Sequence, residues 1–233
     1  GCSILFISHK LHEVNALCDK ATILRGGKVT GTCIPSETSP SQMARLMLGD
    51  ELELQESMPA GKAGECLLSL DNINVKPRDA FAINLQDIEL KLHAGEILGL
   101  AGVAGNGQDE LVDLINGELG SSSGNLMFNG KEIGATGVQQ RRNLGLAVVP
   151  AGRIGRGALG NMSLTENNLL TSYINQTGPF GWINWSGIKS RAATIIERFK
   201  VKANGPEASA KSLSGGNLQK FIIGREILQN PKV

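Results

Sequence analysis

The first part of the chain carries a hydrophobic run followed by an amphipathic stretch. Residues 4–7 (Ile-Leu-Phe-Ile) are continuously apolar, which is typical of a buried strand. Ser8 follows this run, and serine is a preferred N-cap residue, so we expect a helix over about Lys10–Cys18. A strand that leads directly into a helix is typical of the α/β class.

A hairpin and a second helix are predicted next. Two short strands, Ala21–Leu24 and Lys28–Gly31, flank the dipeptide Gly26-Gly27, which favours a tight turn. The run Ser39-Pro40-Ser41-Gln42 is a capping box with proline at the first helical position, and Gly49 is a suitable helix end. We therefore expect a helix between these two signals.

Charged residues mixed with proline and glycine then interrupt the pattern. We expect residues 50–64 to be a linker between an ordered stretch, 1–49, and a second unit, 65–233. The second unit opens with strands predicted over Cys66–Ile73 and Leu85–His93. The latter alternates apolar and polar residues, which indicates a half-buried strand.

Strands continue to alternate with helices along the second unit. Glu96–Ala101 is a more fully apolar strand, and it leads through a glycine-rich loop into a helix that starts at about Gln108. Asn129-Gly130 favours another hairpin. Further strands are predicted over Leu126–Phe128, Lys131–Ile133 and Leu146–Val149.

The later part of the second unit is rich in helical signals. Ser163-Leu164-Thr165-Glu166 is a capping box that opens one helix, and Ser186 is the expected N-cap of the next. Ile188, Ala192, Ile195 and Phe199 form an apolar stripe on that second helix. The whole pattern predicts an α/β protein with a helical part near its end.

Composition excludes several classes of protein. The 233 residues are 41% hydrophobic and 19% charged, which allows a packed core and is too apolar for disorder. Lys and Arg number 23 against 22 Asp and Glu, so the net charge of +1 argues against a nucleic-acid partner. The four cysteines have no histidines at zinc-ligand spacing, so we expect reduced thiols and no metal ligands from this chain.

The run Gly102-Val103-Ala104-Gly105-Asn106-Gly107-Gln108-Asp109, called here the glycine loop, lies between a predicted strand and a predicted helix. Its spacing fits G-x-x-x-x-G-K-[ST], in which backbone N–H groups and a helix N-terminus hold phosphate. Gln108 replaces the lysine and Asp109 the magnesium-binding hydroxyl, so we expect weakened nucleotide binding and severely impaired hydrolysis. A strand–helix turn that never binds a nucleotide is the alternative. The candidate binding residues are Gly102, Gly105, Asn106, Gly107, Gln108 and Asp109.

A second glycine motif, Leu213-Ser214-Gly215-Gly216-Asn217, is called here the signature segment. A Ser-Gly-Gly turn at a helix start can direct a hydroxyl and several N–H groups at a phosphate. An ordinary N-cap with flexible glycines is the alternative. The candidate binding residues are Ser214, Gly215, Gly216 and Asn217.

Together the two motifs resemble the nucleotide-binding subunits of ABC transporters, whose signature reads LSGGQ. They are similar to the tandem ATPases of bacterial simple-sugar and nucleoside importers, whose second half carries a degenerate G-N-G-Q loop and an L-S-G-G-N signature. The resemblance covers nearly the whole chain. It implies an α/β P-loop NTPase fold with a helical subdomain over about 155–215. It also implies that residues 1–49 are a remnant of a first ABC ATPase domain.

The resemblance also assigns two residues outside these motifs. Ile7-Ser8-His9-Lys10-Leu11 resembles the strand end that carries the family's switch histidine, which makes His9 the candidate catalytic residue. A neutral imidazole can donate to a terminal phosphate oxygen, and a solvated cap residue is the alternative. Phe81 is the candidate for stacking on adenine, with a core residue at a strand edge as its alternative.

In the resembled proteins two domains pair head to tail, and each ATP lies between one domain's phosphate loop and the other's signature. His9 and Ser214–Asn217 would then face one competent ATP site, and the glycine loop would belong to a degenerate site. The implied function is the ATP-binding, ATP-hydrolysing component of a sugar or nucleoside importer, with ATP and Mg²⁺ as ligands. The implied partners are transmembrane permease subunits and, indirectly, a periplasmic or lipoprotein solute-binding protein. The implied location is peripheral, on the cytoplasmic face of the plasma membrane.

The sequence departs from the family at two further points. Ala151 and Gly152 stand where the family's Q-loop supplies a polar side chain, whereas Arg153 resembles an arginine found there in sugar importers. The family's Walker B strand would follow Val233, so we expect a fragment that is inactive alone. The alternatives are a non-hydrolysing scaffold half and a soluble ABC protein that acts on DNA or ribosomes. The absence of basic excess disfavours the latter.

Overall fold

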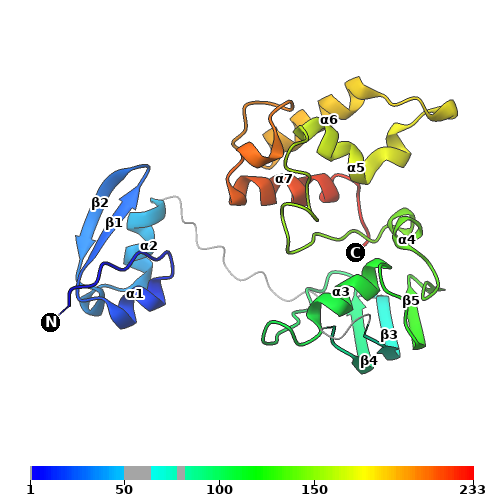
Figure 1. Cartoon of the computed structure of the whole chain (residues 1–233), viewed down its shortest axis with the longest axis horizontal. Helices are drawn as coiled ribbons and strands as arrows, with labels where there is room; N and C mark the ends of the chain where they lie inside the picture. Colours follow the sequence, from blue (N-terminus) through cyan, green and yellow to red (C-terminus); the bar gives the residue numbers. More distant parts are fainter. Residues whose placement is uncertain (1, 50–63, 78–81) are drawn as a thin grey trace. The chain divides into compact units, whose positions relative to one another are not determined.

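The computed structural model describes residues 2–49, 64–77 and 82–233, which form two compact units. The small unit holds residues 2–49, and the large unit holds the others (Figure 1). The elements of the small unit are α1 (Leu11–Leu17), β1 (Ala21–Arg25), β2 (Lys28–Cys33), the 3-10 helix η1 (Pro35–Glu37) and α2 (Pro40–Leu48).

The hairpin and second helix of the small unit form as predicted. β1 and β2 pair antiparallel, and Gly26 and Gly27 take the positive φ values, 58° and 78°, that the turn requires. At the start of α2, the Ser39 hydroxyl accepts the Gln42 N–H at 3.2 Å, and the Gln42 side chain accepts the Ser39 N–H at 3.1 Å. Met43 of α2 is fully buried and supplies the core of this unit.

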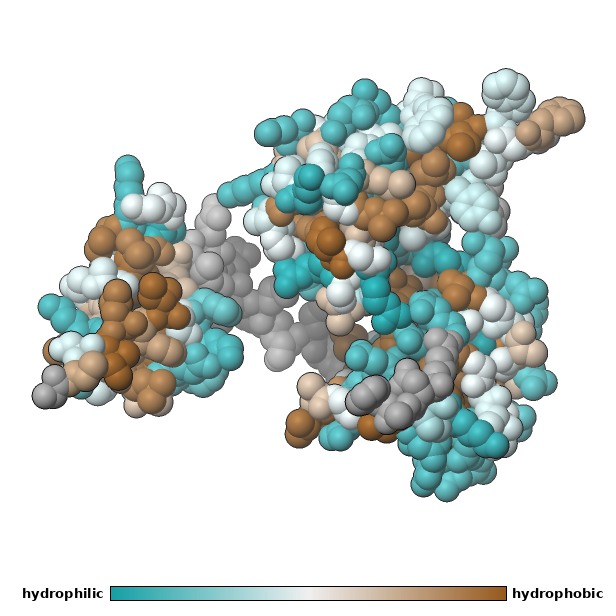
Figure 2. All heavy atoms as spheres, in the orientation of Figure 1, coloured by the Kyte–Doolittle hydropathy of each residue, from teal (hydrophilic) through white to brown (hydrophobic). Residues whose placement is uncertain are grey.

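The strand predicted over residues 4–7 does not form in the described part of the chain. Ile4, Leu5 and Ile7 expose 85, 90 and 89% of their surface. Figure 2 shows hydrophobic side chains on the visible surface of this unit. The prediction was wrong because a strand needs a hydrogen-bonded neighbour, and β1 and β2 pair with each other.

The first helix starts later than predicted. α1 begins at Leu11 with Lys10 as its N-cap, so Ser8 does not cap it. The Ser8 hydroxyl instead accepts the Lys10 N–H at 3.1 Å and donates to the Glu13 carboxylate at 2.9 Å. These bonds hold the bend that contains His9.

The large unit is built on an antiparallel sheet of four strands, in the order β4-β3-β5-β6. β4 has the predicted bounds, and Asn129 and Gly130 make the predicted turn between β5 and β6, with φ values of 49° and 73°. The elements of this part are β3 (Cys66–Val75), β4 (Leu85–His93), α3 (Gln108–Asn116), β5 (Ser123–Phe128), β6 (Lys131–Glu132) and α4 (Val138–Leu144).

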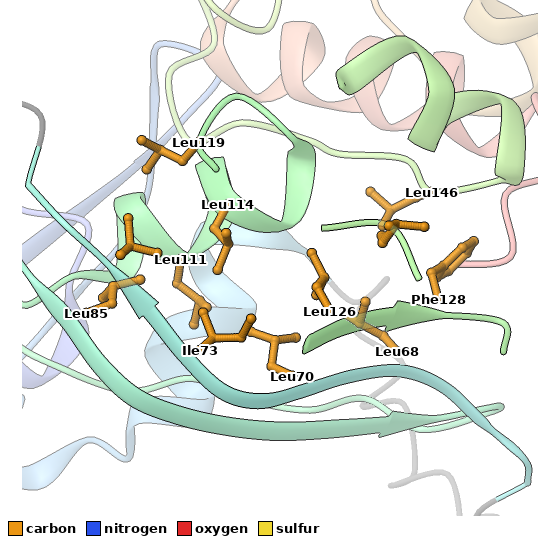
Figure 3. Packing of buried hydrophobic residues seen from close by; sticks show 12 residues of the cluster. Leu68, Leu70, Ile73, Leu85, Leu111, Leu114, Leu119, Leu126, Phe128 and Leu146 are labelled. Carbon is orange, nitrogen blue, oxygen red and sulfur yellow. The ribbon is translucent and has the colours of Figure 1, made fainter. Parts of the chain in front are cut away.

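α3 packs on this sheet and forms its hydrophobic core. Figure 3 shows Leu111 and Leu114 of α3 directed toward Leu70 and Ile73 of β3. Leu114, Leu70 and Ile73 are fully buried. Burial of one such side chain contributes roughly 1.5–3 kcal/mol, so this packing fixes the helix that follows the glycine loop.

The helical part of the large unit contains α5 (Leu164–Gln176), η2 (Pro179–Gly181), α6 (Trp185–Arg198), η3 (Ala210–Ser212) and α7 (Gly215–Ile227). The predicted capping box opens α5, because the Ser163 hydroxyl accepts the Glu166 N–H at 3.1 Å and the Glu166 carboxylate accepts the Ser163 N–H at 2.7 Å. In the described ranges, every helix is too short or too polar to cross a membrane.

The predicted N-cap of α6 was wrong by two residues. Asn184 is the N-cap, and its side-chain oxygen accepts the Gly187 N–H at 3.0 Å. The Ser186 hydroxyl donates to the same Asn184 oxygen at 2.9 Å. Asn184 and Ser186 are both good capping residues, and the longer side chain of Asn184 reaches the N–H groups of the first helical turn.

Two further strands predicted for the large unit are not strands in the described structure. In the segment 96–101, Ile97, Leu98 and Leu100 expose 99, 41 and 54% of their surface. In the segment 146–149, the Ala147 N–H donates to the Val233 carbonyl at 2.7 Å, and this pairing is too short to count as a strand. Hydrophobicity signals burial, whereas a strand also needs a partner along its length.

A buried ion cluster joins α4 to α7. The Glu226 carboxylate of α7 accepts hydrogen bonds from Arg142 of α4 and, at 2.8 Å, from Arg225. Arg225 also donates to the Asn167 carbonyl of α5 at 3.1 Å. Burial lowers the pKa of Arg225, and the charge of Glu226 opposes that change. The cluster therefore holds the helical part, with its signature segment, against the sheet part of the large unit.

Candidate nucleotide-binding site

The glycine loop leads into the first turn of α3, and its backbone geometry requires glycine at two positions. Gly105 and Gly107 have φ values of 84° and 97°, in the left-handed region that favours glycine. A Cβ atom on Gly107 would also lie 2.7 Å from Leu85 of β4. The loop therefore has the tight turn and close approach on which phosphate-binding loops depend.

The Gln108 side chain folds back across this loop. Its Nε2 donates to the Val103 carbonyl at 3.2 Å, and its Oε1 accepts the Asn106 N–H at 3.1 Å. A Cβ atom on Gly102 would collide with Nε2, so the amide lies directly against that glycine. The predicted residues of the loop are thus together, and Gln108 occupies the Asn106 N–H, a backbone donor of the kind that a phosphate would use.

The first turn of α3 carries negative charge. Asp109 is exposed, and Glu110 beside it accepts the Ile83 N–H at 3.0 Å. Carboxylates stabilise a helix N-terminus, and they also repel a phosphate that approaches it. Gln108 is uncharged and Asp109 has no hydroxyl, so these side chains do not fit a magnesium-bound terminal phosphate.

Ion pairs attach the turn around Gly152 to α3 and to the residues just after it. Arg156 donates to Asp113 at 2.7 Å and to Glu118 at 2.9 Å. The hydrogen bond that Arg156 donates to Asp113, together with the negative charge of Asp113, raises the pKa of Arg156. Beside these ion pairs, α3, this turn and Arg225 of the buried cluster line a cavity of about 680 Å³. Ala151 and Gly152, which the resemblance aligned with the Q-loop of ABC transporters, also line this cavity.

The signature segment forms the N-terminus of α7. Ser214 is the N-cap, and Ser214, Gly215 and Gly216 are exposed. Asn217 folds back: its Oδ1 accepts the Lys202 N–H at 2.9 Å, and its Nδ2 donates to the Ser214 oxygen at 2.8 Å. Because Ser214 accepts this bond, its own O–H can donate outward. An exposed hydroxyl and exposed N–H groups at a helix N-terminus fit a phosphate.

Arg153 is a residue of this site that the sequence candidates did not include. A Cβ atom on Gly215 would collide with a guanidinium nitrogen of Arg153, so the arginine lies over the N-terminus of α7. It reaches there from the turn around Gly152, which lies far from α7 in the sequence. Its resemblance to the importer arginine was the available signal, but its position beside the signature was not readable from sequence.

The two other candidate residues lie elsewhere. His9 is exposed in the small unit, in the bend before α1. Phe81 lies outside the described residues. In the large unit, the glycine loop folds around the Gln108 side chain, and Asn217 makes hydrogen bonds that order the signature segment. His9 belongs to the small unit.

Comparison with known proteins gives the family. Residues 85–233 match the family model for ABC transporters. The chain is 34% identical over 232 residues to the nucleoside import ATP-binding protein NupA of Lactococcus lactis, which covers 99% of this chain and 46% of NupA. It is 33% identical over 234 residues to the glucose import ATP-binding protein TsgD13 of Haloferax volcanii, which covers 99% and 42%.

A third relative is the galactose/methyl galactoside import ATP-binding protein MglA of Haemophilus influenzae. It is 32% identical over 233 residues, which covers 100% of this chain and 45% of MglA. The chain thus spans less than half the length of the curated relatives that it matches.

Solved structures give the fold. A nucleotide-free ATP-binding cassette from an ABC transporter has a TM-score of 0.56 at 26% identity, over 72% of this chain and 66% of that one. The dimeric, post-hydrolysis ATP-binding cassette MJ0796 bound to ADP and Pi has a TM-score of 0.58 at 16% identity, over 71% of each chain. The predicted α/β P-loop NTPase fold is confirmed. With this fold and the match over residues 85–233, the chain belongs to the ABC transporter family of ATP-binding domains.

Proposed function

We propose that this chain is part of the ATP-binding component of an importer and couples ATP binding and hydrolysis to uptake of a simple sugar or a nucleoside. The names of its relatives, which are import ATP-binding proteins for a nucleoside, glucose and galactose or methyl galactoside, support this solute class. The observation that carries the use of ATP is the signature segment, in which Asn217 leaves the exposed Ser214 hydroxyl ready to donate.

The chain is assigned to a tandem ATPase. Residues 1–49 are the C-terminal part of a first nucleotide-binding domain, 50–64 are a linker, and 65–233 belong to a second domain. Two observations support this division. The relatives align along the whole chain, whereas the family model begins at residue 85. The described residues also form two units, which fall on either side of the linker.

The competent ATP site is composite. Ser214, Gly215 and Gly216 donate to the terminal phosphate of an ATP that is bound by the phosphate loop of the paired domain. His9 of the first domain donates to the same phosphate, and Mg²⁺ enters with the nucleotide. The exposed donors at the N-terminus of α7 and the neighbouring Arg153 fit an anionic ligand.

The glycine loop belongs to a second, degenerate site that does not hydrolyse ATP. Its backbone keeps the shape of a phosphate loop, but Gln108 and Asp109 do not provide the charge and the metal-binding hydroxyl. This role of the loop agrees with the weakened nucleotide binding and severely impaired hydrolysis that the sequence predicts for it.

The partners are transmembrane permease subunits, with a periplasmic or lipoprotein solute-binding protein beyond them. The protein is peripheral, on the cytoplasmic face of the plasma membrane. The connection between α5 and α6 supports a protein contact, because Phe180 and Trp182 in it and Trp185 at the start of α6 expose 96, 78 and 51% of their surface. Figure 1 shows this connection extending beyond the helices that it joins.

ATP turnover in the whole protein that carries these residues tests the proposal. We expect Ser214→Arg to lower the turnover number by about 100-fold or more, because the arginine fills the phosphate position and removes a donor. His9→Ala is expected to have a similar effect. Ser41→Arg, which puts the same charge on an exposed position of α2, is the matched control and leaves turnover unchanged. Undiminished turnover in Ser214→Arg would falsify the composite site.

A further inference from the structure

We propose that the Gln108 side chain closes the glycine loop by taking the place of a phosphate. The two hydrogen bonds of its amide, to Val103 and from Asn106, are called here the Gln108 bridge. This inference rests on the proposed function, since it assumes that the loop is a nucleotide site. It goes further because Gln108 does more than lack the charge of the usual lysine. Its side-chain amide competes with the nucleotide for the loop.

The chemistry of the bridge is fixed at both ends. A backbone carbonyl can accept and a backbone N–H can donate, so Nε2 faces Val103 and Oε1 faces Asn106, at 3.2 and 3.1 Å. The amide oxygen therefore accepts an N–H of the phosphate-binding loop, which is the role that a phosphate oxygen has in a functional loop. The contact of Nε2 with Gly102 shows that the amide crosses the loop from one end to the other.

The surroundings stabilise the closed loop. Gly107 holds the turn because its positive φ and its contact with Leu85 exclude a side chain there. This turn brings the first residue of α3, Gln108, back toward Val103. Asp109 and Glu110 offset the positive end of the helix, so the loop keeps little charge with which to attract an anion. A phosphate that enters must break both bonds of the bridge.

The bridge predicts that truncation of Gln108 strengthens nucleotide binding, whereas truncation of a binding residue normally weakens it. Gln108→Ala removes the competing amide and adds no charge, so we expect the 233-residue chain to bind a fluorescent ATP analogue about 10-fold more tightly. A residue that helped to hold phosphate would give the opposite result. Gln139→Ala is the matched control, because the Gln139 amide in α4 donates to the Asn143 side chain, away from the loop.

A second measurement does not depend on nucleotide. Amide hydrogen exchange of Asn106 in the same chain is expected to be slow in wild type and faster in Gln108→Ala, since the bridge protects that N–H. Unchanged exchange, or weaker nucleotide binding in Gln108→Ala, overturns the bridge.

Gln108→Lys separates this inference from the proposed function. Binding by Gln108→Lys together with weaker or equal binding by Gln108→Ala keeps the loop as a nucleotide site and overturns the bridge. If neither variant binds the analogue, the loop is not a nucleotide site, and both the proposed role of the loop and the bridge are overturned. Tighter binding by both variants supports the bridge.

Discussion

The side-chain amide of Asn217 donates to the hydroxyl oxygen of Ser214 at 2.8 Å, while its carbonyl end accepts the Lys202 N–H. Both polar atoms of the Asn217 side chain, the last of the signature segment, are therefore hydrogen-bonded within the protein. The sequence predicts it as a binding residue, and from these two bonds we infer that it positions Ser214. Because the Ser214 oxygen accepts this bond, its O–H is free to donate to another group.

Removal of Asn217 should act through Ser214. We expect Asn217→Ala to lower the turnover of ATP in the whole protein by about 10-fold, because two hydrogen bonds are lost. In a Ser214→Ala background the same change should cost little more, since the residue that Asn217 positions is already gone. The measurement is a double-mutant cycle of kcat/KM, and additive losses would contradict the positioning role.

The buried Glu226 should be important for the stability of the large unit. Glu226→Gln leaves Arg142 and Arg225 without their shared countercharge, so we expect a loss of about 3–5 kcal/mol in the free energy of unfolding. The matched control is Glu207→Gln, because Glu207 forms an exposed pair with Lys189 at 3.1 Å and is expected to lose at most about 1 kcal/mol. Urea denaturation followed by circular dichroism measures both, and equal losses would contradict the prediction.

The capping box of α5 should give the protein an acid-sensitive component. Hydrogen bonds from the backbone N–H and the hydroxyl of Ser163 lower the pKa of Glu166 below its ordinary value of 4.5. The folded state thus prefers the ionised carboxylate, and its contribution is complete above about pH 4.5 and lost as pH falls through the lowered pKa. We expect a smaller decline of the melting temperature between neutral and acidic pH in Glu166→Gln than in wild type. An identical decline in both proteins would rule this contribution out.

The exposed aromatic side chains between α5 and α6 should matter for association and not for folding. Trp182 is 78% exposed, so Trp182→Ala is expected to change the free energy of unfolding by no more than about 0.5 kcal/mol. We expect the same variant to weaken co-purification with permease subunits, because exposed tryptophans are frequent anchors of interfaces. An unchanged interaction, or a strongly destabilised protein, would contradict this assignment.

Local signals in the sequence were sufficient for most elements of the fold. Capping boxes at Ser39 and Ser163 and the turn at Asn129 and Gly130 depend on nearby residues, and all of them form as predicted. Strand formation depends on distant partners, which is why the apolar runs 4–7 and 96–101 were misassigned. The hydrophobic pattern of a segment does not reveal which other segment will pair with it as a neighbouring strand.

The candidate site shows the same division. The motif spacing located the glycine loop and the signature segment, because both depend on consecutive residues. It could not reveal that the Gln108 amide turns back to Asn106, or that Arg153 lies over Gly215, since these contacts depend on side-chain direction and on tertiary packing. The catalytic role of His9 and the adenine-stacking role of Phe81 remain predictions from sequence.

The extended segment 96–101 has a consequence for handling the protein in solution. Ile97 is almost fully exposed, and among the described residues the backbone from 97 to 101 has no ladder partner. An apolar segment with unpaired N–H and C=O groups is a template for intermolecular strand pairing. We therefore expect the chain to self-associate as its concentration rises, so that light scattering should detect oligomers before any loss of helical content.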